Sequence, residues 1–374
     1  MDDVLIIGGG VIGLSLAYEL SGRGIKVRVL ERDAAGRAAS WAGAGIVPAA
    51  SGQDGQHPHH LLAGLSCRLH AQWSERLREA TGIDTGYVRC GGLYLATDTV
   101  QLDALALQSE TMRRAGIPFE TVDSDHIAEL DPVLSRAAYP RAAAILGGAF
   151  SPGEAQIRNP RHMRALRAAC AAQGVRIDEF QPVEECEIRG GRVESVRTPL
   201  GRCSAEAVVL TTGCWSGVWA HRLGVRLAVR PVRGQIVLLD CHAGKPRRVI
   251  NVGPRYLVPR RDGRLLVGST EEDAGFAART TAKGVSGLLN FALELVPALA
   301  DARLERCWAG LRPGTADGLP YLGRLPGLKN AYVATGHFRS GLQLSPGTAI
   351  VMSQLIRGQP PEIDLTPFRV DRGS

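Results

Sequence analysis

The chain is basic but has very little lysine and no cluster of cationic residues. Of its 44 Lys and Arg side chains only four are lysine, and the formal net charge is +7. A nucleic-acid-binding domain gathers its cations on one face or in one run, whereas these arginines are spread along the sequence, with no RNA-binding motif rich in aromatic residues. We therefore expect no nucleic-acid partner. The charge reflects an arginine-rich composition, which would also suit an anionic substrate.

Long hydrophobic runs are absent as well. No apolar stretch approaches the roughly 18–20 residues that a membrane-spanning helix requires. The acidic start MDDVLIIGGG does not resemble a secretory signal. We expect a cytoplasmic protein with no membrane partner. The 374 residues, of which 45% are hydrophobic, are enough for two globular domains.

The sequence also lacks the usual signs of a metal site or a disulfide framework. Its eight cysteines include no C-x-x-C pair, so we expect buried thiols in a reducing compartment. The run His57-Pro58-His59-His60 is rich in histidine, but no second cluster of ligand residues accompanies it. A surface loop is favoured there over a metal site, and we expect no bound metal.

A glycine-rich stretch near the N-terminus has the pattern of a phosphate-binding turn. The apolar run Val4–Ile7 predicts a buried parallel strand, Gly8-x-Gly10-x-x-Gly13 follows it, and a helical pattern comes next. Gly8 permits the tight turn, Gly10 lets the backbone approach a pyrophosphate, and Gly13 lets helix and strand pack closely. The N–H groups that open the helix would bind the phosphates. The stretch therefore predicts a dinucleotide site.

The acid that ends the next strand narrows the choice of dinucleotide. Val27–Leu30 predicts a second strand, and it finishes on Glu31, whose carboxylate would accept a hydrogen bond from a ribose hydroxyl. The same carboxylate would repel a 2′-phosphate, so NADP is disfavoured. NAD and FAD both remain open at this point.

Three strand-to-glycine turns, spread over the chain, favour FAD. After Glu31 the sequence leaves the βαβ alternation of an NAD-binding domain and enters a small-residue segment at 36–46. Apolar runs that end in glycine recur at 207–213 and at 331–336. We therefore predict an α/β fold with a Rossmann-like FAD-binding domain assembled from discontinuous segments.

Four further blocks carry a resemblance to a known family. They are PVRGQ at 231–235, YLVPRRDGRLLVGST from 256, WAGLRPGTADGLPYLG from 308 and ATGHFRSGLQLSP from 334. With the N-terminal glycines, they make the chain similar to the D-amino-acid-oxidase-type flavoproteins and, within these, to the glycine oxidases of thiamine biosynthesis. The resemblance covers most of the chain and is loose over 50–140.

The resemblance implies FAD that is held without a covalent bond. Related sarcosine oxidases attach the flavin through a cysteine, but the matching position here is Ala309, and Cys307 lies two residues away. The residues that would contact the cofactor are Gly8, Gly10, Val11, Ile12, Gly13, Glu31, Arg32, Ala39, Ser40, Ala44, Gly45, Ile46, Val183, Gly213, His337, Phe338, Arg339, Ser340, Gly341, Leu342 and Gln343.

The resemblance also assigns catalytic roles to three residues. Arg312 would hold the substrate carboxylate through two parallel hydrogen bonds, Tyr256 would point its hydroxyl at the substrate, and Arg339 would lie beside flavin and substrate. The implied reaction oxidises glycine or another small amine by hydride transfer to flavin N5. The imine then gives glyoxylate and ammonia, and O2 is reduced to H2O2. No side-chain base is required if the amine arrives neutral.

Two departures from the family leave the substrate open. Pro254 stands where a glycine oxidase carries His, and Glu271 stands where an apolar Met is expected. Glycine, sarcosine, a small D-amino acid and another secondary amine remain candidates. A D-amino-acid or imino-acid dehydrogenase that passes electrons to a membrane quinone is the main alternative. An NAD-linked dehydrogenase or a plain nucleotide-binding module is the third.

The motifs and the resemblance together give a two-domain plan. The expected segments are 1–45, 145–215 and 307–365 for the FAD-binding domain, and 46–144 and 216–306 for a smaller α+β substrate domain with an antiparallel sheet. Expected elements are helices over 61–80 and 102–115, a helix that starts at Asn159-Pro160, a hairpin across Asp262-Gly263 and a helix capped by Ser345-Pro346. The family also implies a homo-oligomer, in glycine oxidases a tetramer.

Overall fold

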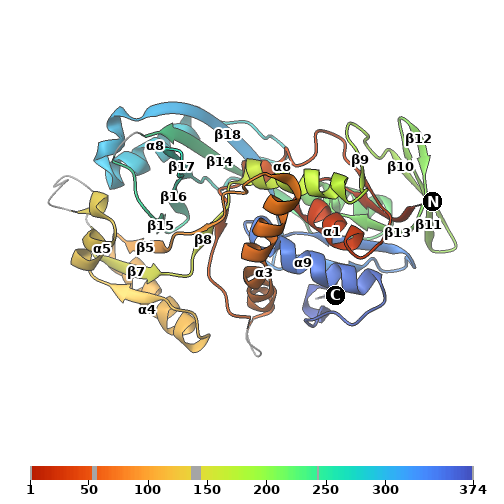
Figure 1. Ribbon diagram of the computed structural model, residues 1–374, viewed down its shortest axis with the longest axis horizontal. Helices are drawn as coiled ribbons and strands as arrows, with labels where there is room; N and C mark the ends of the chain where they lie inside the picture. Colours follow the sequence, from red (N-terminus) through yellow and green to blue (C-terminus); the bar gives the residue numbers. More distant parts are fainter. Residues whose placement is uncertain (1, 53–56, 136–144, 242–243, 373–374) are drawn as a thin grey trace.

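The computed structural model describes residues 2–52, 57–135, 145–241 and 244–372. The chain forms an α/β fold around two large sheets, which lie toward opposite ends of an elongated molecule (Figure 1). The predicted fold class is confirmed.

The first sheet contains the glycine-rich turn. Its six strands run in the order β19-β20-β13-β1-β2-β9, and all neighbours are parallel except β19 and β20. The continuous apolar run of β1 is buried, as expected of a central parallel strand. The strands are β1 (Asp2–Ile7), β2 (Val27–Leu30), β9 (Arg176–Asp178), β13 (Ala205–Leu210), β19 (Tyr321–Arg324) and β20 (Ala331–Thr335).

Four helices pack together beside this sheet (Figure 1). Their apolar side chains share one core with β1, and Leu14, Leu62, Leu166 and Val351 are fully buried in it. Removing such side chains from water is the main source of stability here, at about 2 kcal/mol for each leucine. The helices are α1 (Val11–Ser21), α3 (Pro58–Thr81), α6 (Asn159–Ala172) and α9 (Gly341–Ile356).

The second sheet is mainly antiparallel. Its eight strands run in the order β18-β14-β17-β16-β15-β5-β7-β6, and only β15 and β5 are parallel neighbours. The hairpin predicted across Asp262-Gly263 joins β16 to β17. The strands are β5 (Gly92–Ala96), β6 (Glu120–Val122), β7 (Gly147–Ser151), β14 (Arg230–Asp240), β15 (Val249–Val252), β16 (Arg255–Pro259), β17 (Arg264–Gly268) and β18 (Arg303–Gly314).

The other elements are shorter or peripheral. Three-stranded sheets are formed by β10 (Glu185–Arg189), β11 (Arg192–Thr198) and β12 (Gly201–Cys203), and by β3 (Ile46–Val47), β8 (Ala155–Gln156) and β4 (Val88–Arg89). The further α-helices are α2 (Ala39–Ala42), α4 (Thr99–Arg114), α5 (Ser124–Leu130), α7 (Ser216–Arg222) and α8 (Ala282–Leu295). The predicted helix over 102–115 corresponds to α4. Strand β7 pairs in the second sheet, although the expected segments place it with the first; the domain limits stay a prediction.

The surface loop predicted at the histidine run was wrong. His57 caps α3, and its Nδ1 accepts a hydrogen bond from the backbone N–H of His59 at 3.3 Å. Pro58 opens the helix, because its fixed φ suits the first helical position and it has no N–H to leave unpaired. Residues 53–56, just before it, lie outside the described part. Within that part, no group of three or more His, Cys, Asp or Glu side chains is arranged to hold a metal.

The predicted start of the last helix was also wrong. Helix α9 begins at Gly341, so Pro346 lies inside it rather than in its first turn. Proline cannot donate to the carbonyl four residues earlier, and here the Ser345 hydroxyl donates to that carbonyl, Leu342 O, at 3.0 Å. The Ser345 hydroxyl therefore supplies the hydrogen bond to Leu342 O that Pro346 cannot donate.

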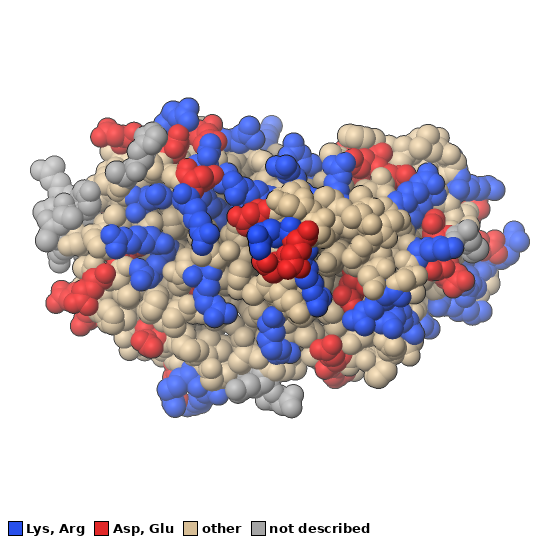
Figure 2. All heavy atoms as spheres, in the orientation of Figure 1, with Lys and Arg blue, Asp and Glu red and all other residues tan. Residues whose placement is uncertain are grey.

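The charges are mixed over the face of the molecule shown in Figure 2. Lys and Arg side chains alternate there with Asp and Glu and do not form one continuous basic patch. No helix of the described residues is both long and apolar enough to cross a membrane.

Candidate active site

A cavity of about 870 Å³ is lined by residues from both large sheets. All residues predicted to bind cofactor or substrate line it, with the exception of Gly13. A Cβ on Gly13 would lie 2.0 Å from the Gly8 carbonyl oxygen. The absence of a side chain at Gly13 therefore allows α1 to pack closely on the end of β1. The cavity therefore gathers segments that are far apart in the sequence.

One end of the cavity lies over the glycine-rich turn. Gly8 has a φ of +114°, and a Cβ there would lie 2.5 Å from the Thr211 carbonyl oxygen, so only glycine fits. The Glu31 carboxylate accepts hydrogen bonds from the N–H groups of Gly9 at 2.7 Å and Asp33 at 3.0 Å. The Ser40 hydroxyl accepts from Val11 N–H at 2.8 Å, at the N-terminus of α1. This end offers backbone dipoles and one carboxylate, as a dinucleotide requires.

Aromatic and cationic side chains stack beside the glycine-rich end. The Arg32 guanidinium lies 3.6 Å from the centre of the Trp215 ring, and Phe276 stacks on the same indole at 5.6 Å between ring centres. Trp215 and Arg32 both line the cavity. Sequence reasoning included Arg32 but missed Trp215, since its only signal was its position directly after the turn at Gly213.

A second helix N-terminus points at the cavity from residues 337–343. The N–H of Phe338, whose φ is +47°, donates to Pro313 O at 3.0 Å, and Ser340 N–H donates to His337 O at 2.9 Å. Burial lowers the pKa of His337 to about 3, so its ring is neutral, and its Nε2 lies 3.0 Å from Thr348 Oγ1. The positive end of the α9 dipole therefore acts here without a histidine charge.

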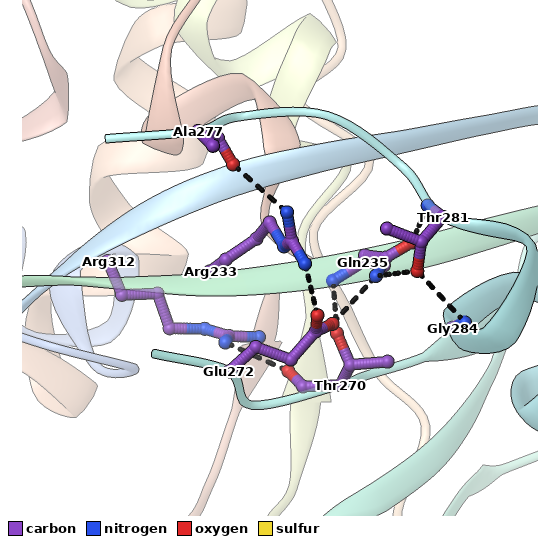
Figure 3. Close-up of polar contacts among 8 residues, drawn as sticks. All are labelled: Arg233, Gln235, Thr270, Glu272, Ala277, Thr281, Gly284 and Arg312. Atoms are coloured by element: carbon purple, nitrogen blue, oxygen red, sulfur yellow. Dashed lines mark hydrogen bonds and ion pairs between the residues drawn. The ribbon is translucent and has the colours of Figure 1, made fainter. Parts of the chain in front are cut away.

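Arg312 lies on β18, at the side of the cavity formed by the second sheet. Its Nη2 donates to Ser269 Oγ at 2.7 Å. Its Nη1 donates to Thr270 O at 3.1 Å (Figure 3). Both acceptors are neutral, and Arg312 forms no ion pair with a described residue. Burial lowers the pKa of Arg312, and the neighbouring Tyr256 partly offsets this effect. The guanidinium stays charged and keeps donors for an anion.

Tyr256 is 9% exposed. Its ring packs against β17 at a position without a side chain. It pairs in register with Gly268 on β17, where a Cβ would lie 2.3 Å from the tyrosine ring. Because Gly268 has no side chain, the ring of Tyr256 occupies the space over this residue, near Arg312. The sequence placed Tyr256 in a hairpin but gave no sign of this glycine's role.

Arg339 is more exposed than the other two. Its Nη2 donates to the carbonyl of Pro254 at 2.9 Å, and its Nη1 lies 3.8 Å from the Glu271 carboxylate. The two residues that depart from the family pattern are therefore the ones that hold Arg339. Glu271 does not line the cavity, but it places a negative charge next to Arg339.

A polar network fixes the loop that holds Arg312 (Figure 3). The Glu272 carboxylate pairs with Arg233 and accepts from Gln235 Nε2 at 2.6 Å. Gln235 also joins Thr270 and Thr281: its N–H donates to Thr270 Oγ1 at 2.9 Å, and its Oε1 accepts from Thr281 N–H at 2.8 Å. The loop after β17 is thereby tied to β14, which keeps Ser269 and Thr270 under the guanidinium.

The comparisons with known proteins agree with this arrangement. The model of the family described as "DAO: FAD dependent oxidoreductase" matches residues 3–355. The chain belongs to this family. It is 36% identical to a glycine oxidase of Pseudomonas putida over 370 residues, which cover 98% of this chain and 97% of that protein. It is 38% identical to the bifunctional protein ThiO/ThiG of Synechocystis over 364 residues, 96% of this chain and 52% of that protein.

The fold agrees as closely as the sequence. The crystal structure of glycine oxidase from Geobacillus kaustophilus superposes with a TM-score of 0.94 at 34% sequence identity, covering 100% of this chain and 99% of that one. FAD is accordingly the cofactor of this flavoprotein. The cavity fits it, since two helix N-termini and the glycine cradle line one continuous space. The individual cofactor and substrate contacts remain predictions.

Proposed function

We propose that this flavoenzyme oxidises glycine or another small amino acid, with O2 as acceptor. One observation carries the proposal: the Arg312 guanidinium faces the cavity with only neutral oxygen partners. A partly buried cation that forms no ion pair favours a ligand that supplies an anion. A carboxylate fits a guanidinium through two parallel hydrogen bonds. The names of the relatives, glycine oxidases, support the choice of a small amino acid.

The residues of the cavity would then bind and orient the substrate. Arg312 holds the carboxylate, Tyr256 closes the pocket over β17, and Arg339 adds a second positive charge at the pocket edge. The amine must be neutral when the C–N double bond forms, because an ammonium has no lone pair. His337 does not serve as the base, since its ring is buried and bonded to Thr348.

FAD supplies the two-electron oxidation when it is bound. The positive end of α9 would stabilise negative charge on the cofactor. The net reaction converts glycine, O2 and water into glyoxylate, ammonia and H2O2. The imine itself would serve the synthesis of the thiamine thiazole. We also propose a cytoplasmic homo-oligomer, as in the family, with the domain segments given above.

A peroxide assay of the purified yellow protein tests the proposal. Glycine, sarcosine, D-alanine and D-proline are compared, with Arg312→Ala as the variant and bound flavin measured by absorbance. We expect H2O2 formation with at least one substrate, and a KM raised about 100-fold or more in the variant, since charge-assisted bonds are lost. A normal KM in Arg312→Ala, or reduction of a quinone but not of O2, would overturn it.

A further inference from the structure

Glu154 is a buried carboxyl beside the cavity that the proposed reaction does not use. It follows β7, is 0% exposed, and forms no ion pair with a described residue. Its Oε2 accepts a hydrogen bond from the Tyr94 hydroxyl, and its Oε1 accepts from Asn251 Nδ2 at 3.2 Å. Burial raises the pKa of Glu154 to about 7. A buried carboxyl with no cation is costly to the fold, so its two partners matter.

Both partners lie in one row of the second sheet with Tyr256. In register, Tyr94 pairs with Asn251, and Asn251 pairs with Tyr256. All three residues line the cavity. The side chain of Glu154 lies over Gly92, on the same face of β5 as Tyr94, where a Cβ would lie 2.4 Å from the carboxyl. The carboxyl is thus held directly behind the cavity wall.

The row places Asn251 across the pocket from Arg312. The guanidinium reaches the end of β17, and the strand order from there is β17, β16, β15. Neighbouring strands are about 4.8 Å apart, so the backbone of β15 at Asn251 lies roughly 10 Å from the backbone of β17, with Tyr256 on β16 between them. A small amino acid with one hydrogen bond of about 3 Å at each end spans a gap of this order.

Glu154 decides which end of the Asn251 amide faces the cavity. In the ionised form of Glu154 both carboxyl oxygens accept, and Nδ2 of Asn251 donates to Oε1. Oδ1 is then the atom left for the cavity, and no donor among the described residues bonds to it. Without such a neighbour, the side-chain amide can rotate by about 180° and direct either Oδ1 or Nδ2 at the cavity. The pocket therefore has cationic donors at Arg312 and a neutral acceptor at Asn251.

We propose that Asn251 Oδ1 accepts a hydrogen bond from the substrate amine, and that Glu154 is the positioning residue that holds the amide in this orientation, an inference that rests on the proposed function. The substrate class follows from the chemistry. A neutral primary or secondary amine has an N–H for Oδ1, whereas a neutral tertiary amine has none. Glycine and sarcosine are expected as substrates, and N,N-dimethylglycine as a poor one.

Two variants of Glu154 test the positioning role. Glu154→Gln keeps an acceptor for Asn251 Nδ2 and places a donor at Tyr94, whereas Glu154→Leu removes both. We expect a KM for glycine within about 3-fold of the parent in Glu154→Gln, and a KM raised about 10-fold with a smaller change in kcat in Glu154→Leu. An unchanged KM in Glu154→Leu, or equal losses in both variants, would overturn the role.

The contact with the amine is tested by ligand binding to the holoenzyme. Acetate shares the carboxylate of glycine but has no amine, and its binding is followed by the flavin absorbance. Asn251→Leu should raise the KM for glycine about 10-fold and leave the Kd of acetate within about 2-fold, while Arg312→Met should weaken both. Equal weakening of acetate and glycine in Asn251→Leu would refute the amine contact. Unchanged acetate binding in Arg312→Met would instead refute the proposed function.

Discussion

A Cβ atom on Gly234 would lie 2.2 Å from Nη2 of Arg312, so the guanidinium occupies the space that any other residue at 234 would fill. Gly234 is on β14, and in register it pairs with Gly310, two residues before Arg312 on β18. The arginine side chain therefore crosses β14 on its way to Ser269 and Thr270. One glycine thus makes room for the proposed carboxylate-binding group.

Replacing this glycine should damage substrate binding more than folding. In Gly234→Ala the guanidinium must leave its place, and we expect the KM for glycine to rise about 10- to 100-fold, since charge-assisted bonds to the carboxylate are weakened. Steady-state peroxide formation measures the change. FAD content should stay near that of the parent, because Gly234 lies at the substrate side of the cavity.

Gly287→Ala is the matched control for this variant. Gly287 is inside α8, and a Cβ there meets no heavy atom within 4 Å. Alanine should leave the KM unchanged and stabilise the helix by about 0.5–1 kcal/mol. The account of Arg312 is wrong if Gly234→Ala behaves like this control.

The sequence was most informative where one local pattern dictates one geometry. Gly8 and the apolar run before it predict a strand, a tight turn and a helix, because each step depends on residues that are neighbours in the chain. Arg312 could be named through the family resemblance, which carries information about distant contacts. Gly234 and Gly268 could not, since their role is to leave space for side chains that belong to other strands.

Long-range hydrogen bonds explain the missed network, and together with a local bond they explain the failure at the start of α9. Pro346 is tolerated inside α9 because Ser345 bonds Leu342 O. The next residue, Gly347, donates its N–H to Ser66 on α3 at 3.0 Å. The network of Gln235, Glu272 and Thr281 joins residues up to 46 positions apart. No spacing rule links such residues, so only the folded chain reveals them.

Trp215 should contribute to the retention of FAD. The indole lines the cavity and contacts both the Arg32 guanidinium and Phe276. Trp215→Ala removes both contacts, each of which stabilises its partners by about 0.5–1.5 kcal/mol, and we expect the Kd of FAD to rise about 10-fold. Titration of the apoprotein with FAD, followed by flavin fluorescence, measures this. Trp215→Phe keeps a ring and should lose less; identical losses in the two variants would exclude stacking as the cause.

The pair formed by Glu272 and Arg233 should stabilise the loop under Arg312. Burial opposes the charge of Glu272, but hydrogen bonds from Thr270, Arg233 and Gln235 outweigh it and lower its pKa. Glu272→Gln removes the charge beside a buried arginine, and we expect a loss of about 1–3 kcal/mol in the free energy of unfolding.

The neighbouring pair of Glu271 with Arg339 is wider, at 3.8 Å, and exposed. Glu271→Gln is therefore the control, with a change below about 1 kcal/mol. Similar effects in both variants, measured by urea unfolding of the holoenzyme, would contradict this difference.

The buried carboxyl of Glu154 should make the enzyme less stable as the pH rises from about 5 to 8. Burial raises the pKa of Glu154 from 4.5 to about 7. Between these values the unfolded chain loses the proton while the folded chain keeps it, so the free energy of unfolding falls with increasing pH. Each pKa unit corresponds to about 1.4 kcal/mol, which gives a loss of about 2–3 kcal/mol from this group.

Glu154→Gln cannot ionise and keeps the neighbours of the carboxyl, so subtracting its unfolding curve removes all other titrations. We expect the variant to gain about 2–3 kcal/mol over the parent between pH 5 and pH 8. Parallel pH profiles for the two proteins would mean that Glu154 titrates alike in the folded and unfolded chain.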